Sequence, residues 1–257
     1  MAKNQIFNKG TVTETYKLPS LGRLYGSDFP EEVTIRSMTT FEEKMRLGNQ
    51  GFWRTMINIL NAVVTDPEDF DAENLTLFDF YFMMYKMRTV SYGNIYKVRV
   101  TCPDCGKVSI CDVDLDKLAV TYIPDDFIEP YEIGPLPRNN DTLQCRLPRV
   151  IDSIRNDKKA QDLLKRNPEY QGDPSYIFNL ASQIVGINGE KLPAKEIEMY
   201  VERMTGLDSA YFQQATAKKV DTLGMDTECH EVCSSCGTEL IFTLPFNSEF
   251  FRPTFDI

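Results

Sequence analysis

One stretch decides the fold: IYKVRVTCPDCG, residues 95–106. Apolar and polar side chains alternate up to Val100, which predicts a β-strand with one buried face. A Cys-x-x-Cys-Gly turn follows, and the alternation returns from Val108 to Val113. The sequence therefore predicts a β-hairpin that carries Cys102 and Cys105 at its tip.

The same arrangement occurs again near the end of the chain. The turn CSSCG, residues 233–237, lies between two further strand-like runs, 226–232 and 238–244. Zinc prefers four soft ligands in a tetrahedral arrangement, and a Cys-x-x-Cys turn supplies two thiolates at the required spacing. The glycine after each second cysteine permits the left-handed bend of such a turn. The two turns predict a zinc ribbon with the ligands Cys102, Cys105, Cys233 and Cys236.

This zinc ribbon is split, because 127 residues separate Cys105 from Cys233. Closing a loop of that length costs about 4 kcal/mol, whereas a structural zinc contributes roughly 10–16 kcal/mol in small peptides. The metal is therefore able to hold the two halves together. Four thiolates fill the coordination shell, so we expect a structural zinc rather than a catalytic one. Two alternatives stay open: a redox pair of thiols, and cysteines that bind nothing.

The remaining cysteines and the single histidine are expected to lie outside the metal site. Seven is an odd number of cysteines and the N-terminus has no apolar signal core, so we expect reduced thiols. We expect Cys111, Cys145 and Cys229 as small buried apolar residues. Cys229 and His230 stay open as substitute ligands, although a surface position is favoured for His230. A chain with one histidine lacks the partners for His-rich metal sites.

Helical periodicity surrounds the hairpins, so the predicted fold class is α+β, mostly helical, with the split four-Cys zinc ribbon made of two β-hairpins. A capping box of Thr40 and Glu43 is expected to begin one helix. Another, ending at Gly93, is expected to be buried on all sides, because its apolar residues lie nearly all round. The predicted helices cover residues 40–47, 52–64, 75–92, 148–166, 174–185, 193–204 and 208–223, the last with Gly224 as its cap. The predicted divisions are an N-terminal extended and helical region (1–94), the ribbon (95–113 and 226–246), a mainly helical insertion (114–225) and an aromatic C-terminal tail (247–257).

The chain ends with LPFNSEFFRPTFDI, residues 244–257, which is rich in aromatic residues. So many phenylalanines in a short segment are expected to be buried, either on this chain or on a partner. The candidate partner-binding residues are Phe250, Phe251, Arg252 and Phe255.

Charge and composition argue against several classes of function. The 257 residues hold 28 Lys and Arg against 38 Asp and Glu, and the net charge of −10 repels the phosphates of nucleic acid. The longest apolar stretch, residues 75–85, is too short to span a bilayer. Neither a GxSxG nor a GxGxxG motif occurs, so we expect neither an enzyme nor a small-molecule substrate.

Three groups of residues together carry a resemblance to a known family. They are LPSLGRLYG (18–26) with VTIR and MTT (33–40); SYG (91–93) with Tyr96 and CPDCG (102–106); and LDS (207–209) with CSSCG (233–237), LPF (244–246) and FFRP (250–253). In these residues the chain resembles the baseplate hub protein family of T4-like tailed bacteriophages. The segment 112–225 matches this pattern more loosely.

The resemblance implies a non-enzymatic hub subunit or hub assembly factor of the tail baseplate. It implies other baseplate or tail proteins as partners, a place in the virion tail after assembly in the host cytoplasm, and the four cysteines as a zinc site. It supplies no catalytic residue. The alternative hypothesis is a zinc-ribbon adaptor that binds nucleic acid, against which the acidic surroundings of the second turn argue.

Overall fold

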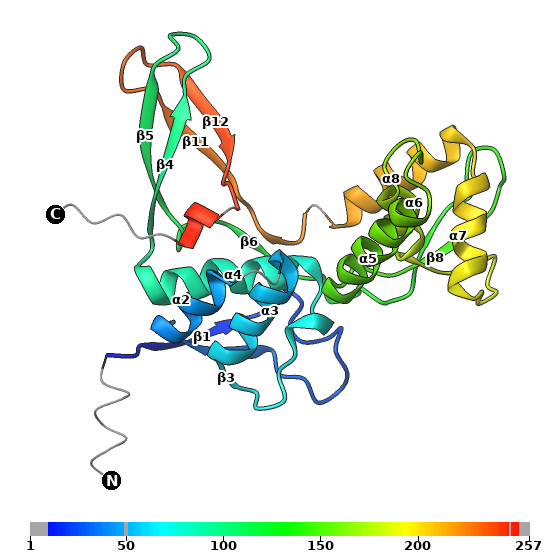
Figure 1. Cartoon of the computed structure of the whole chain (residues 1–257), viewed down its shortest axis with the longest axis horizontal. Helices are drawn as coiled ribbons and strands as arrows, with labels where there is room; N and C mark the ends of the chain where they lie inside the picture. The colour runs from blue at the N-terminus through cyan, green and yellow to red at the C-terminus, as the bar shows by residue number, and fades with distance from the viewer. Residues whose placement is uncertain (1–9, 49–50, 221, 247, 252–257) are drawn as a thin grey trace.

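The computed structural model describes residues 10–48, 51–220, 222–246 and 248–251. Helices and several small antiparallel sheets make up this part of the chain, which confirms the α+β class. Figure 1 shows three parts: a body from residues 10–48 and 51–94, an arm of two β-hairpins above it, and a lobe from residues 122–220 beside it. The arm carries the two cysteine turns, so the arm and its base on the body are the parts that matter for the site.

The body is a three-stranded sheet covered by helices. Its strands pair in the order β1–β2–β3. The predicted helix at 40–47 is present, but the predicted capping residues are wrong by one position. Thr39 is the N-cap, and Glu42 closes the capping box. The Glu42 carboxylate also forms an ion pair with Arg36 of β2 at 2.8 Å, which joins the first turn of the helix to the sheet. The elements are β1 (Thr13–Lys17), β2 (Glu32–Arg36), α2 (Thr40–Arg46), α3 (Phe52–Val63), β3 (Val64–Asp66), η1 (Ala72–Asn74) and α4 (Leu77–Tyr92).

Helix α4 lies at the centre of the described structure, as its apolar sequence predicted. Phe80, Met83, Met84 and Met87 are completely buried. One end of the helix contacts the lobe through Phe78, and the other end lies below the arm. In the described part of the chain, no helix is both long enough and apolar enough to cross a membrane.

Asp79 is a buried carboxylate in the first turn of α4. It accepts hydrogen bonds from the Ser20 backbone N–H at 3.0 Å and from the Tyr25 hydroxyl at 2.5 Å. It therefore ties the loop after β1 to the central helix. Burial raises the pKa of Asp79 to about 6, although these two donors act in the opposite direction.

The raised pKa of Asp79 predicts a pH-dependent stability. The folded pKa lies above the unfolded value, so the stability linked to protonation is fully present below the unfolded pKa and is lost as pH rises through about 6. Wild type loses this stability between pH 5 and pH 7.5, whereas Asp79→Asn has no carboxyl group to ionise. The unfolding free energy of Asp79→Asn minus that of wild type should therefore be about 1 kcal/mol more positive at pH 7.5 than at pH 5. Urea titrations at the two pH values measure this difference, and an equal offset at both would contradict it.

The arm consists of two antiparallel hairpins, β4 (Ile95–Thr101) with β5 (Val108–Asp114) and β11 (Glu228–Val232) with β12 (Glu239–Thr243). The predicted strands are therefore present. Their inner faces pack together through Cys111, Leu240 and Phe242, beside the cysteine turns. The two hairpins stand side by side in Figure 1, although their residues are far apart in the sequence.

The lobe has its own core around Leu143, Leu147 and Phe212, which are completely buried. Four helices cover a small antiparallel sheet of order β7–β8–β9. The elements are β7 (Tyr131–Ile133), β8 (Leu143–Cys145), α5 (Val150–Arg166), α6 (Ser175–Ala181), β9 (Ile184–Ile187), α7 (Ala194–Arg203) and α8 (Gly206–Val220).

Two expectations for the lobe are wrong. The helix predicted at 174–185 ends at Ala181, because the β-branched residues of β9 pair with β8 and are mostly buried there.

Gly224, expected as a helix cap, instead begins β10 (Gly224–Met225), which pairs with β6 (Val120–Thr121). Its φ is +88°, and a Cβ at this position would lie 3.0 Å from the Cβ of Phe78, so glycine is required.

The described part of the aromatic C-terminal segment packs on this chain. Phe250 and Phe251, in η2 (Ser248–Phe251), are 0% and 1% exposed. The ring of Phe250 contacts Tyr85 of α4 and Tyr96 of β4, with centroids 4.8 Å and 5.1 Å apart. This burial favours self-packing over partner binding for the two residues. The other two candidates, Arg252 and Phe255, lie outside the described residues.

Candidate metal centre

The two cysteine turns have the same backbone geometry. In the first, the Cys102 N–H donates to the Lys107 carbonyl at 2.9 Å; in the second, Cys233 donates to Thr238 at 2.8 Å. Gly106 and Gly237 have φ values of +69° and +78°, in the left-handed region that favours glycine. Each turn therefore presents its two thiols in the same way.

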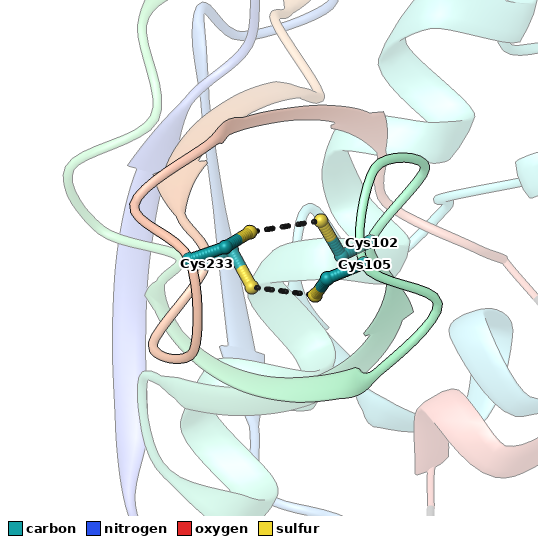
Figure 2. A group of neighbouring side chains, drawn as sticks. Cys102, Cys105 and Cys233 are labelled. Atoms are coloured by element: carbon teal, nitrogen blue, oxygen red, sulfur yellow. Dashed lines mark hydrogen bonds between the residues drawn. The ribbon is translucent and has the colours of Figure 1, made fainter.

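The four predicted ligands come together at the far end of the arm. The Sγ atoms of Cys102 and Cys236 are 3.6 Å apart, and those of Cys105 and Cys233 are 3.8 Å apart. All four sulfurs lie within 4.8 Å of one another. Figure 2 shows the Cys102 and Cys105 side chains of one turn pointing toward Cys233 of the other.

This spacing fits a tetrahedral zinc. Four sulfurs bonded to zinc at about 2.3 Å in a tetrahedron are about 3.8 Å from one another. The distances between Cys102 and Cys236 and between Cys105 and Cys233, 3.6 Å and 3.8 Å, match that value closely. The donor set and its geometry are therefore suitable for a zinc ion held by two thiolates from each turn.

Neighbouring hydroxyl groups support the second turn. Ser109 of β5 places its Oγ 3.5 Å from Cys233 Sγ, and its hydrogen bond is the largest of several that lower the pKa of Cys233 to about 6. Contacts with Thr238, whose hydroxyl lies 3.3 Å from Cys236 Sγ and whose backbone also hydrogen-bonds to this sulfur, lower the pKa of Cys236. Both effects favour the thiolates that a metal requires.

The same threonine also joins the two turns directly. Thr238 Oγ1 donates to the Asp104 carboxylate of the first turn at 2.8 Å. Neither this contact nor the role of Ser109 was predicted from the sequence. The signal for Ser109 was the strand alternation, which places it on the inner face between the outward-facing Val108 and Ile110. No local sequence pattern indicates the pairing of Thr238 with Asp104, because 134 positions separate them.

The other cysteines and His230 lie outside this group. Cys111, Cys145 and Cys229 are buried, as expected. His230 is on the exposed side of β11, with its ring nitrogens 3.1 Å from Glu228 and Glu239. Neither open substitute, Cys229 or His230, belongs to the four-sulfur group that the structure brings together.

The comparison with known families now decides the identity. A family model described as T4 bacteriophage base plate protein matches residues 11–252. The chain belongs to this family. The match spans the body, the arm and the lobe, so it confirms the resemblance to T4-like phage baseplate proteins and does not depend on the cysteine turns alone. Membership indicates a structural tail protein located in the virion tail.

No curated protein and no solved structure matches the chain. The family and the geometry of the arm are therefore the two observations from which a function follows.

Proposed function

We propose that this chain is a non-enzymatic structural or assembly protein of the phage baseplate hub. The observation that carries the proposal is the family match over residues 11–252, which covers every part of the described fold. Its immediate partners are other baseplate or tail proteins. It is assembled in the host cytoplasm and acts in the tail.

The proposed metal is one structural zinc held by Cys102, Cys105, Cys233 and Cys236. Its contribution is to fix two hairpins that are separated by 127 residues of chain. Four thiolates leave no coordination position for a substrate, so the zinc has no catalytic part in this proposal. The arm then acts as a rigid projection from the body.

The charge of the second hairpin supports protein rather than nucleic-acid partners. Glu228 and Glu239 lie on the outer side of the second hairpin, Glu239 beside the cysteine turn and Glu228 at the other end of β11. Four thiolates with one Zn²⁺ carry a net charge of −2, and these carboxylates add to it. Phosphate groups would be repelled from this side of the arm.

A gene deletion with complementation tests the proposed function. We expect phage without this chain to produce few or no infectious particles and no complete baseplates in electron micrographs. The wild-type chain supplied from a plasmid should restore both. Normal plating and normal baseplates without the chain would overturn the proposal.

Mass spectrometry of purified particles separates the two forms of the proposal. Presence of the chain in virions at a fixed ratio to other tail proteins supports a structural component. Its absence from virions, combined with the assembly defect, supports an assembly factor. A DNA- or RNA-binding measurement at physiological salt is the control, since tight binding would favour the nucleic-acid adaptor instead.

A further inference from the structure

The arm has two outer faces that carry exposed aliphatic side chains. On β5, Val108 and Ile110 are 59% and 64% exposed. On the other hairpin, Val232 and Ile241 are 65% and 58% exposed. On each hairpin the two branched residues are grouped on one exposed sheet face, and apolar groups of this kind are candidate surfaces for another protein to cover.

The charges on these two faces are opposite. We define the basic face as Val108 and Ile110 with Arg99, the register partner of Ile110, and Lys107 beside them. The carboxylates of this hairpin have partners: Asp112 lies opposite Lys97, Asp114 pairs with Lys117, and Asp104 accepts a hydrogen bond from Thr238 of the second turn. We define the acidic face as Val232 and Ile241 with Glu228, Glu239 and His230. Even a protonated His230 would leave the acidic face with a net negative charge from its two carboxylates.

The two faces point in opposite directions. The inner sides of the hairpins are packed together through Cys111, Leu240 and Phe242. The basic face is therefore on one outer side of the arm and the acidic face is on the other. One molecule is unable to bring its own two faces into contact, whereas a second copy is able to do so.

We propose that copies of this chain associate head to tail, with the basic face of one arm against the acidic face of the next. Each contact then joins two aliphatic pairs and places Arg99 and Lys107 opposite Glu228 and Glu239. Pairing a face with its own kind would bring like charges together, so a symmetric dimer through either face is disfavoured. A head-to-tail contact repeats from copy to copy and closes into a ring when the rotation permits.

Both members of the complementary pair of faces belong to this one chain, so a second copy of the chain is the partner that each face fits. Both faces have two aliphatic residues on one side of a hairpin, and the charges around them differ in sign. The inference goes beyond the proposed function, because a baseplate protein could also act as a single copy.

Sedimentation velocity of the full chain tests the proposal over a range of concentrations. We expect association that strengthens with concentration and weakens as salt increases, because screening reduces the attraction between exposed charges. Two charge-reversed variants give the sharp test: Arg99→Glu with Lys107→Glu on the basic face, and Glu228→Lys with Glu239→Lys on the acidic face. Each variant alone should associate on the order of tenfold more weakly than wild type.

Mixing the two variants separates this proposal from simple misfolding. In the mixture, each contact between the two variants places an acidic face against a basic face. Association should therefore return to near the wild-type level. Lys165→Glu with Arg166→Glu, on the exposed end of α5, is the matched control and should leave association unchanged. A wild-type chain that stays monomeric, or a mixture that does not associate, would overturn the proposal. A different tail protein binding to these faces of a monomeric chain would also overturn it.

Discussion

Replacing Cys102 or Cys233 with serine should remove the zinc and destabilise the arm more than any other single change there. We expect about one zinc per chain in the wild type and almost none in either variant. A structural zinc contributes roughly 10–16 kcal/mol in small peptides, and closing the intervening loop costs about 4 kcal/mol. The unfolding free energy should therefore fall by about 6 kcal/mol or more, measured by urea titration beside elemental analysis.

The matched control for this prediction is Cys111→Ala. Cys111 is buried on the inner side of β5, close to the cysteine turns but outside the four-sulfur group. This variant should keep its zinc and lose only about 1 kcal/mol. Full zinc content in Cys102→Ser, or a wild-type chain without bound metal, would show that the four thiols do not form the centre.

Replacing Arg88 with alanine should destabilise the fold by about 3–5 kcal/mol. Its guanidinium group is buried where α4 ends, and it donates to the carbonyls of Gly93 at 2.6 Å, Ile95 at 3.2 Å and Phe250 at 3.0 Å. It also lies over the ring of Tyr96, 4.8 Å from the centroid. Alanine would leave three carbonyls without their donors and would loosen the body, the arm and the C-terminal segment from one another.

Lys86→Met is the control for this second prediction. Lys86 is also largely buried on α4, but its ion pair is with the half-exposed Asp116 at 2.9 Å. We expect it to cost about 1 kcal/mol or less, because such a pair near the surface contributes little. Arg88→Lys should not rescue stability, because an ammonium group lacks the planar fork of donors. Equal losses in Arg88→Ala and Lys86→Met would contradict the proposed role.

The sequence was informative where a local pattern determines the structure. Strand alternation on both sides of Cys102 and Cys233 predicted the hairpins, and the apolar run before Gly93 predicted the buried helix. Local cysteine spacing was also sufficient to nominate the four thiols that the structure brings together. These features are readable because each depends on residues within a few positions of one another.

The sequence was less informative where contacts between residues far apart in the chain determine the structure. The helix predicted to continue to Val185 gives way to β9, because pairing with β8 outweighs local helix periodicity. The aromatic segment could not be assigned to self-packing until Phe250 was seen beside Tyr85 and Tyr96. The triple contact of Arg88 was not apparent, since its acceptor Phe250 lies 162 positions away.

The pairing of Thr121 with Gly224 has an evolutionary consequence. The chain enters and leaves the lobe on two neighbouring strands, whose backbones are about 5 Å apart. A lobe of different length could therefore be exchanged at this point without moving the two cysteine turns relative to each other. The side of the lobe that faces the body is constrained, because it contacts Phe78 of α4 and pairs with the backbone of Leu75 and Thr76. The side of the lobe away from the body is free to diverge in sequence. Replacing the lobe alone would then allow the same body and arm to contact different neighbouring proteins.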